Sequence, residues 1–234
     1  MKYKRVLLKL SGEVLAGGKK QGIDFEYVSK LANEIAEIKK TGVQIAIVIG
    51  GGNFWRYRDF QSSDIERVNS DYMGMMATVM NSIAFASSLK KNGLKSRVFS
   101  ALHFPLVVEN YSVRQVKNYL NKDYVVICAG GTGNPFFTTD TAAALRASEL
   151  RCELLLKATN VDYVYDKDPK TNPDAKLFKN LTYQQVLEDQ LKVMDLSSIA
   201  MCNDSKIPVA VFNLNKSGNI LKVLKGKSVG TIIS

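Results

Sequence analysis

Residues 43–56 read VQIAIVIGGGNFWR, an apolar run that ends in three glycines. Nearly every position of the run is apolar, and such a strand is typical of a sheet covered on both faces. An earlier apolar run, RVLLKL, occupies residues 5–10. The stretch between the two runs has apolar residues at helical spacing, opens with Asp24 and closes with Gly42. Together these features predict a strand, helix, strand unit.

The same alternation continues along the rest of the chain. Further strands are predicted at residues 96–100, 124–129, 153–158, 209–212 and 231–234. Helices are predicted near residues 70–91, 112–121, 140–152, 182–190 and 215–225. No internal repeat and no low-complexity linker interrupts the pattern. We therefore expect one α/β domain over residues 1–234, a three-layer α/β/α sandwich with a mostly parallel central sheet.

Composition narrows the possible functions. The 32 basic and 22 acidic residues give a formal net charge of +10, which favours anionic partners and leaves nucleic acid and phosphorylated metabolites both open. No apolar run reaches the roughly 20 residues that cross a bilayer, and the first residues lack a signal-peptide pattern, so we expect a cytoplasmic protein without membrane contact. The three cysteines stand singly at 128, 152 and 202, which indicates reduced core thiols rather than disulfides or zinc ligands.

Four polar or glycine-rich loops follow predicted strands. Ligands of open parallel sheets bind beyond the carboxyl ends of the strands, in such loops. The loops read KLSGE (9–13), GGGNFWR (50–56), GGTGNPFFTTD (130–140) and KATNVDYVY (157–165). Glycine lets backbone N–H groups approach a ligand closely, and a helix N-terminus adds partial positive charge. Several such loops on one sheet edge predict a phosphate cradle.

Common phosphate-binding and kinase signatures are missing. GKS at residues 226–228 resembles the end of a P-loop, but Leu221 stands where the upstream glycine would be. No GxGxxG follows a strand, and no HRD or DFG motif is present. The single histidine, His103, is not near a nucleophile pattern and is interpreted as structural. Bound phosphate would therefore rely on lysine and backbone groups.

Several motifs together resemble the bacterial uridylate kinases of the amino acid kinase superfamily. They are KLSGE, GGGNFWR, DYMGMMATVMN (71–81), GTGNPFFTTD, LKATNVDYVY and KVMDL (192–196). The resemblance runs from about residue 4 to the C-terminus, and GTGNPFFTTD separates uridylate kinases from carbamate, glutamate and aspartate kinases. It implies transfer of the ATP γ-phosphoryl group to UMP in pyrimidine nucleotide synthesis, with Mg²⁺, by a homohexamer that UTP inhibits.

The resemblance also implies roles for individual residues. Lys9 and Lys157 match phosphate-contacting lysines, and Asp140 and Asp195 would orient them or help to hold Mg²⁺, although no direct metal ligand is assigned. The expected ATP contacts are Lys9, Leu10, Ser11, Gly12, Gly52, Arg56, Thr159, Tyr165 and Asp168. The expected UMP contacts are Gly51, Asp71, Thr132, Gly133, Asn134, Pro135, Phe136, Phe137, Thr138 and Thr139. The part of the chain before about residue 153 would carry mainly the UMP site and oligomer contacts, and the part after it would belong mainly to the ATP site.

This assignment is chemically consistent. The acceptor of a nucleoside monophosphate kinase is a phosphate oxygen that is already anionic at neutral pH, so no general base is required. Catalysis then depends on positioning and on cations that neutralise the moving phosphoryl group. The two phenylalanines at 136 and 137 would shield either the nucleotide or a neighbouring subunit, and the sequence leaves both roles open.

Two positions depart from the family pattern. Tyr163 replaces the usual glycine of VDGVY and adds bulk near the expected adenosine contacts. Gln21 replaces an apolar or aromatic residue in the loop at 17–24, which resembles a loop associated with GTP activation, so we expect weak or absent activation by GTP. Two other functional classes remain: a superfamily kinase that acts on a carboxylate or carbamate, and a nucleic-acid-binding protein, for which no recognition motif is found.

Overall fold

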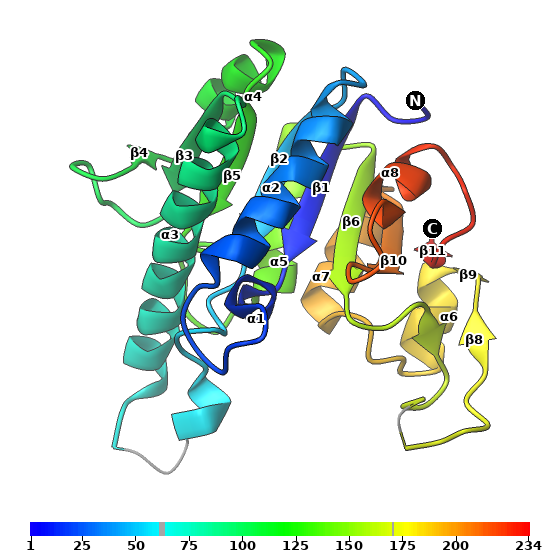
Figure 1. Ribbon diagram of the computed structural model, residues 1–234. Helices are drawn as coiled ribbons and strands as arrows, with labels where there is room; N and C mark the ends of the chain where they lie inside the picture. Colours follow the sequence, from blue (N-terminus) through cyan, green and yellow to red (C-terminus); the bar gives the residue numbers. More distant parts are fainter. Residues whose placement is uncertain (61–63, 170) are drawn as a thin grey trace.

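A mostly parallel sheet forms the centre of the computed structural model, which describes residues 1–60, 64–169 and 171–234 (Figure 1). Within these residues the sheet has nine strands in the order β4-β3-β5-β2-β1-β6-β10-β11-β9. Its strands are β1 Arg5–Leu10, β2 Gln44–Ile49, β3 Ser96–Ser100, β4 Glu109–Asn110, β5 Val125–Ala129, β6 Leu154–Thr159, β9 Asn180–Leu181, β10 Val209–Asn213 and β11 Thr231–Ile233. The β10–β11 pairing is antiparallel, and a separate hairpin pairs β7 Val164–Tyr165 with β8 Leu177–Phe178.

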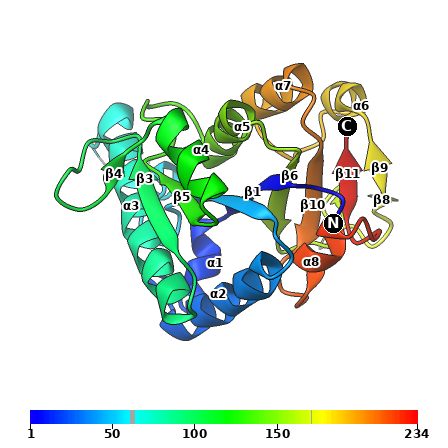
Figure 2. The ribbon, with the colours of Figure 1, turned by 90° about the horizontal axis from the view of Figure 1, so that it is seen from above.

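Helices cover both faces of this sheet (Figure 2). One face carries α1 Gly12–Ala16, α2 Phe25–Lys39, α3 Arg67–Lys91 and α8 Asn219–Leu224. The other carries α4 Val113–Asn121, α5 Thr139–Leu150, α6 Tyr183–Glu188 and α7 Leu196–Asp204. A short 3₁₀ helix, η1 Tyr57–Phe60, follows β2. The expected three-layer α/β/α sandwich is confirmed.

Alternate residues of the central strands enter two separate apolar cores. In β1, Val6 and Leu8 pack with α2 and α8, whereas Leu7 packs with α4 and α5, and all three side chains are fully buried. β2 and β6 behave in the same way. Burial on both faces explains why these strands are largely apolar, because only positions near their ends, such as Arg5, Lys9 and Gln44, are partly exposed.

The differences from the sequence-based prediction are short or boundary elements. Helix α3 begins at Arg67, three residues before the predicted start, and the C-terminal helix is confined to 219–224. Helices α1 and α7 and the two-residue strands were not predicted. Helix α1 and the two-residue strands are too short to show a periodic pattern, and the nine residues of α7 contain no clear apolar stripe, so tertiary packing decides these elements.

Two further observations concern the expected environment of the chain. Among the described residues, no helix combines the length and apolar character that spanning a bilayer requires. Cys128, Cys152 and Cys202 are buried and unpaired, as expected for core thiols. Burial raises the pKa of each of these thiols to about 12, so they stay protonated at neutral pH.

Candidate active site

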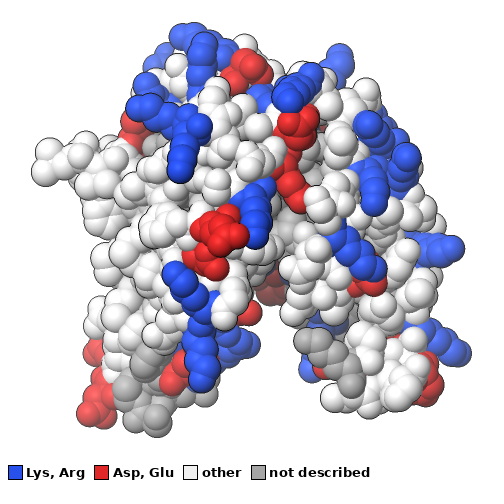
Figure 3. All heavy atoms as spheres, viewed as in Figure 1, with Lys and Arg blue, Asp and Glu red and all other residues white. Residues whose placement is uncertain are grey.

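The loops singled out in the sequence meet at one edge of the sheet. They follow the carboxyl ends of β1, β2, β5 and β6, and these strands are neighbours in the parallel part of the sheet. From β1 the chain continues to β2 on one side, while β6 pairs with β1 on the other side, so the topology switches at β1. The space-filling view shows a notch at this edge, between the α3 side and the β7–β8 side (Figure 3).

Three cavities lie along this edge. The first, of about 630 Å³, lies between the glycine loops and the start of α3. The second, of about 530 Å³, lies over the ends of β1 and β6, and the third, of about 590 Å³, lies beside the β7–β8 hairpin. Lys9 lines the first and second cavities, and Lys157 and Thr159 line the second and third. The shared residues make the three cavities a continuous row.

Lys9 and Lys157 approach the same carboxylate at the centre of the row. Lys9 Nζ lies 2.9 Å from Asp140 Oδ1, and Lys157 Nζ donates to Asp140 Oδ2 over 2.6 Å. The side chain of Lys9 is only 13% exposed, that of Lys157 11% and that of Asp140 16%. Two cations around one carboxylate leave a net positive charge at the junction of the cavities, which suits a phosphate group.

Burial and charge shift two pKa values in this cluster. For Asp140, burial favours the neutral acid, but attraction to Lys9 and Lys157 outweighs it and lowers the pKa of the carboxyl group below 3.8. For Lys157, burial and repulsion from Lys9 prevail over attraction to Asp140, so the pKa of this ammonium group falls below 10.5. At neutral pH the carboxylate is ionised.

The glycine loops pack directly against each other. A Cβ atom at Gly12 would lie 2.6 Å from Asn53 Oδ1 and from backbone atoms of the 50–52 loop. At Gly51 it would lie 2.4 Å from the carbonyl oxygen of Gly74 in α3. Both glycines are therefore required for packing, whatever else they bind, because a Cβ atom cannot approach other atoms so closely.

A pair of buried asparagine side chains, Asn53 and Asn81, supports these loops. Asn53 and Asn81 donate to each other's side-chain oxygens over 2.9 and 2.7 Å. Asn53 also donates to the carbonyl oxygen of Gly22 and Asn81 to that of Gly50, each over 2.7 Å. The pair thus connects α3, the 50–52 loop and the loop at 17–24, and it is 2% and 0% exposed.

Asp195 contacts hydroxyl groups rather than lysines in the described structure. It is the N-cap of α7 and accepts hydrogen bonds from the Ser198 N–H and from the hydroxyls of Thr138, Thr141, Ser197 and Ser198. Burial raises the pKa of this carboxyl, but these hydrogen bonds outweigh burial and lower it to about 2. Through these hydrogen bonds, Asp195 connects the start of α7 to the start of α5. Thr138 is the N-cap of α5.

Most of the residues assigned from the resemblance line the row of cavities. In the first cavity these are Lys9, Ser11, Gly12, Gly51, Gly52, Arg56, Asp71, Asn134, Phe137, Thr138, Thr139 and Asp140. In the third they are Lys157, Thr159, Tyr165 and Asp168, and Tyr163 lies beside them. Arg56, assigned to ATP, lines the first and second cavities and forms a 2.6 Å ion pair with Glu13.

Some assigned residues lie outside the cavity linings, and others were missed. Leu10 is a fully buried core residue, and Thr132, Gly133, Pro135, Phe136 and Asp195 do not line the three cavities. Lining residues that the sequence did not indicate include Glu13, Tyr57, Arg58, Arg67, Ser70 and Met75. The spacing of four between Arg67 and Asp71 indicates a contact on one helix face only if the helix begins at Arg67, three residues before its predicted start.

Comparison with known proteins is consistent with this geometry. The sequence model described as the Amino acid kinase family matches residues 4–213. The chain is 50% identical over 230 residues to the uridylate kinase of Erythrobacter litoralis (strain HTCC2594), covering 98% of this chain and 97% of the relative.

Solved structures agree. The UMP kinase of Bacillus anthracis superposes with a TM-score of 0.97 at 35% identity, covering 100% of this chain and 97% of that one. The UMP kinase of Ureaplasma parvum gives a TM-score of 0.94 at 38% identity, with 100% of both chains covered. The resemblance stated from the motifs is confirmed: this chain belongs to the amino acid kinase family and, within it, to the uridylate kinases.

Proposed function

We propose that the chain transfers the γ-phosphoryl group of ATP to UMP, giving UDP and ADP, with UMP in the first cavity and ATP across the second and third. The uridylate kinase family membership supports the reaction. The observation that carries the placement is the Lys9–Asp140–Lys157 cluster, because it lies where the cavities join. Two polyanions must meet at such a point, and net positive charge there stabilises the charge that develops on the transferred group.

The remaining groups position the substrates. No histidine lines the three cavities, and no general base is needed because the attacking phosphate oxygen is already ionised. Lys9 reaches both the first and second cavities, so its ammonium group can follow the phosphoryl group from donor to acceptor. The N–H groups of the glycine loops add donors that need no reorganisation.

Magnesium fits the donor set as an ion carried by ATP. Mg²⁺ commonly keeps several waters and binds nucleotide phosphates with few protein ligands, and it would neutralise phosphate charge during transfer. Among the described residues, no group of three or more His, Cys, Asp or Glu side chains gathers around a possible metal position. The carboxylate of Asp140, at the junction of the cavities, already contacts two lysines, so its role is to hold these lysines in place.

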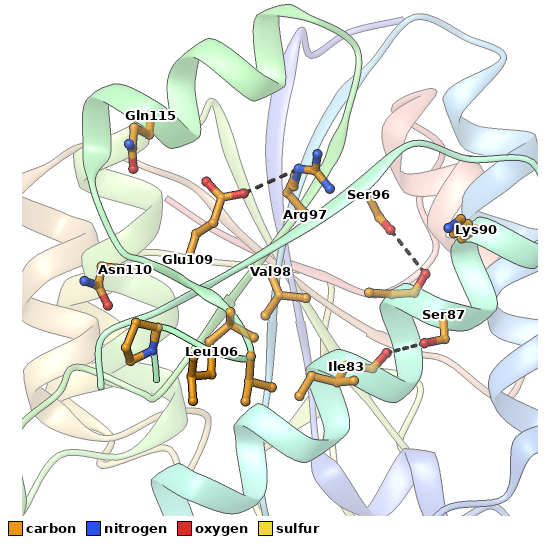
Figure 4. Close-up of a pocket in the computed structure, with 14 residues that line it drawn as sticks. Ile83, Ser87, Lys90, Ser96, Arg97, Val98, Leu106, Glu109, Asn110 and Gln115 are labelled. Atoms are coloured by element: carbon orange, nitrogen blue, oxygen red, sulfur yellow. Dashed lines mark hydrogen bonds and ion pairs between the residues drawn. The ribbon is translucent and has the colours of Figure 1, made fainter. Parts of the chain in front are cut away.

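We further propose a homo-oligomer, expected to be a hexamer. The outer face of α3 exposes Met76 and Met80, which are 42% and 49% exposed, so these methionines are not core residues. Beside α3, β3 and β4 lies a fourth cavity of about 650 Å³ (Figure 4). Leu106, at its rim, is 98% exposed. Exposed apolar groups of this size are typical of subunit contacts, and sedimentation at working concentration tests the assembly.

The expected regulation and setting follow the family resemblance. We expect inhibition by UTP, which resembles UMP in its uridine part, and weak or absent activation by GTP. Initial rates at low UMP with each nucleotide test both. A cytoplasmic role in pyrimidine nucleotide synthesis is consistent with these substrates.

One experiment tests the proposed reaction. ADP release would be measured with Mg·ATP and UMP, CMP, AMP, GMP, carbamate or glutamate, using the unaltered protein and Lys9→Ala. Activity with UMP that Lys9→Ala abolishes would support the proposal. Turnover with carbamate or glutamate instead of UMP would favour another superfamily kinase. If none of these acceptors stimulates ADP release, the proposal is contradicted.

The +10 charge leaves nucleic-acid binding as a second property to exclude. Binding of RNA or DNA that falls steeply between low and physiological salt would mark non-specific attraction by this charge. Binding that persists at physiological salt with a base preference would instead favour a nucleic-acid function.

A further inference from the structure

The carboxylate of Asp71 is held from two sides in the first cavity. Arg67 Nε donates to both of its oxygens at 2.9 Å, four residues earlier on the same helix. The backbone N–H of Phe136, from the loop before α5, donates to Oδ2 over 2.8 Å. The Asp71 side chain is only 15% exposed, so these contacts fix its position.

Arg67 is itself fixed by two aromatic rings. Its guanidinium carbon lies 4.5 Å from the ring centre of Tyr57 in η1 and 5.6 Å from that of Phe136. A guanidinium over aromatic faces is attracted to them electrostatically. Arg67 therefore joins three separate segments around Asp71: η1, α3 and the loop before α5.

The backbone of Phe136 is adapted to this arrangement. Phe136 has a φ of 70°, in the left-handed region that a residue with a large side chain rarely adopts. This conformation accompanies both the donation of its N–H to Asp71 and the placement of its ring on Arg67. Phe137, by contrast, lines the first cavity. The two phenylalanines thus have different roles.

From this geometry we infer that Arg67 is a positioning and specificity-determining residue, which fixes Asp71 as an acceptor for the ribose hydroxyls of the nucleoside monophosphate. The inference rests on the proposed UMP site and deepens it. A carboxylate in a site for a dianionic nucleotide is repulsive unless it is compensated, and Arg67 supplies the compensating charge. Both oxygens of Asp71 remain acceptors, because a carboxylate has about four lone-pair directions.

Loss of Arg67 should act on the nucleoside and not on the phosphoryl transfer itself. Arg67 lines the first cavity but neither the second nor the third. Arg67→Met keeps an unbranched side chain without charge or donors. We expect it to raise KM for UMP about 10- to 100-fold, the usual effect of losing a charge-assisted hydrogen bond, while kcat and KM for ATP change less than about 3-fold. The preference for UMP over 2′-deoxy-UMP should fall by a similar factor.

Arg97 provides a matched control. It is 48% exposed, against 42% for Arg67, contacts the rings of Tyr119 and Tyr124, and pairs with Glu109 at 3.4 Å. It lies near the amino end of β3 and lines the fourth cavity (Figure 4), whereas the first cavity lies at the carboxyl ends of the strands. Arg97→Met therefore removes the same kinds of contact without touching the first cavity, and its KM for UMP should stay unchanged.

Three further results decide the inference. Arg67→Lys, which keeps the charge and loses the planar fork, should recover part of the KM loss. In an Asp71→Asn background, Arg67→Met should add less than about 3-fold, because the partner is already altered. Two outcomes in Arg67→Met would overturn this inference but not the proposed function. One is an unchanged KM for UMP with an unchanged preference over 2′-deoxy-UMP, and the other is a parallel loss of kcat and ATP affinity. Absence of UMP-dependent turnover in the unaltered protein would overturn the proposed function and this inference together.

Discussion

Lys9 and Lys157 are direct partners in the register of the parallel strands β1 and β6. Paired residues of neighbouring strands point to the same face, so two lysines that are far apart in the sequence end side by side. Helix α5 packs on that face and supplies Asp140, whose carboxylate contacts both ammonium groups. The charge balance at the junction of the cavities therefore depends on one acidic residue.

Asp140→Asn should destabilise the protein and abolish most activity. The substitution leaves two nearly buried lysines close together without their counter-charge, which costs about 3 kcal/mol of unfolding free energy. For a chain of this size that corresponds to a Tm about 10 °C lower. Thermal unfolding and ADP release measure the two effects.

The matched control for this variant is Asp162→Asn, which removes the exposed 2.7 Å ion pair with Lys216. Exposed ion pairs contribute little to stability, so this change should be small. If Tm falls equally in the two variants, loss of the Asp140 carboxylate destabilises the protein no more than loss of an exposed ion pair, and the prediction is wrong.

Activity should decline with rising pH at values below those at which an ordinary lysine deprotonates. Burial and repulsion from Lys9 lower the pKa of Lys157 from 10.5, so its charge is lost at a lower pH than that of an ordinary lysine. In Lys157→Arg, whose charge does not titrate, the alkaline decline of kcat should move to higher pH. If kcat declines at the same alkaline pH in both proteins, a group other than Lys157 causes the decline.

Acid should remove a stabilising contribution from Asp195. Its folded-state pKa of about 2 is below the unfolded value of 3.8, so the contribution is complete above pH 4 and is lost as the pH falls toward 2. Because this group is only half-buried, we expect about 1 kcal/mol after solvent screening. Urea unfolding at pH 6 and pH 3 should therefore show a smaller acid loss in Asp195→Asn than in the unaltered protein. The same pH dependence in both would contradict this account.

Asn81→Ala should destabilise the fold and disturb the glycine loop. It leaves buried donors and acceptors of Asn53 and the Gly50 carbonyl without partners, at a cost of about 2 kcal/mol. Ser87→Ala, at an exposed position of the same helix, should change stability by less than about 0.5 kcal/mol. Denaturant unfolding compares the variants, and equal midpoints would show that the amide pair contributes little.

Much of the architecture could be predicted because its signals are local. The seven longer strands were located within about one residue, since most of them are nearly continuous apolar runs bounded by glycine or polar residues. Helix α2 was equally clear from Asp24 and the apolar spacing that follows. Helix α7 was missed, because its nine residues contain no clear periodic stripe and its start depends on the contact of Asp195 with α5.

The sequence by itself determined the doubly covered parallel sheet and the placement of Lys9, Lys157 and the glycine loops at its carboxyl edge, because strand period and strand ends are properties of neighbouring residues. Only the tertiary structure decided which side chains meet there. Asp140 between two lysines and Arg67 between two rings depend on strand register and on how α3 and α5 pack. Such contacts join segments that are distant in sequence, and no local pattern encodes the distance between them.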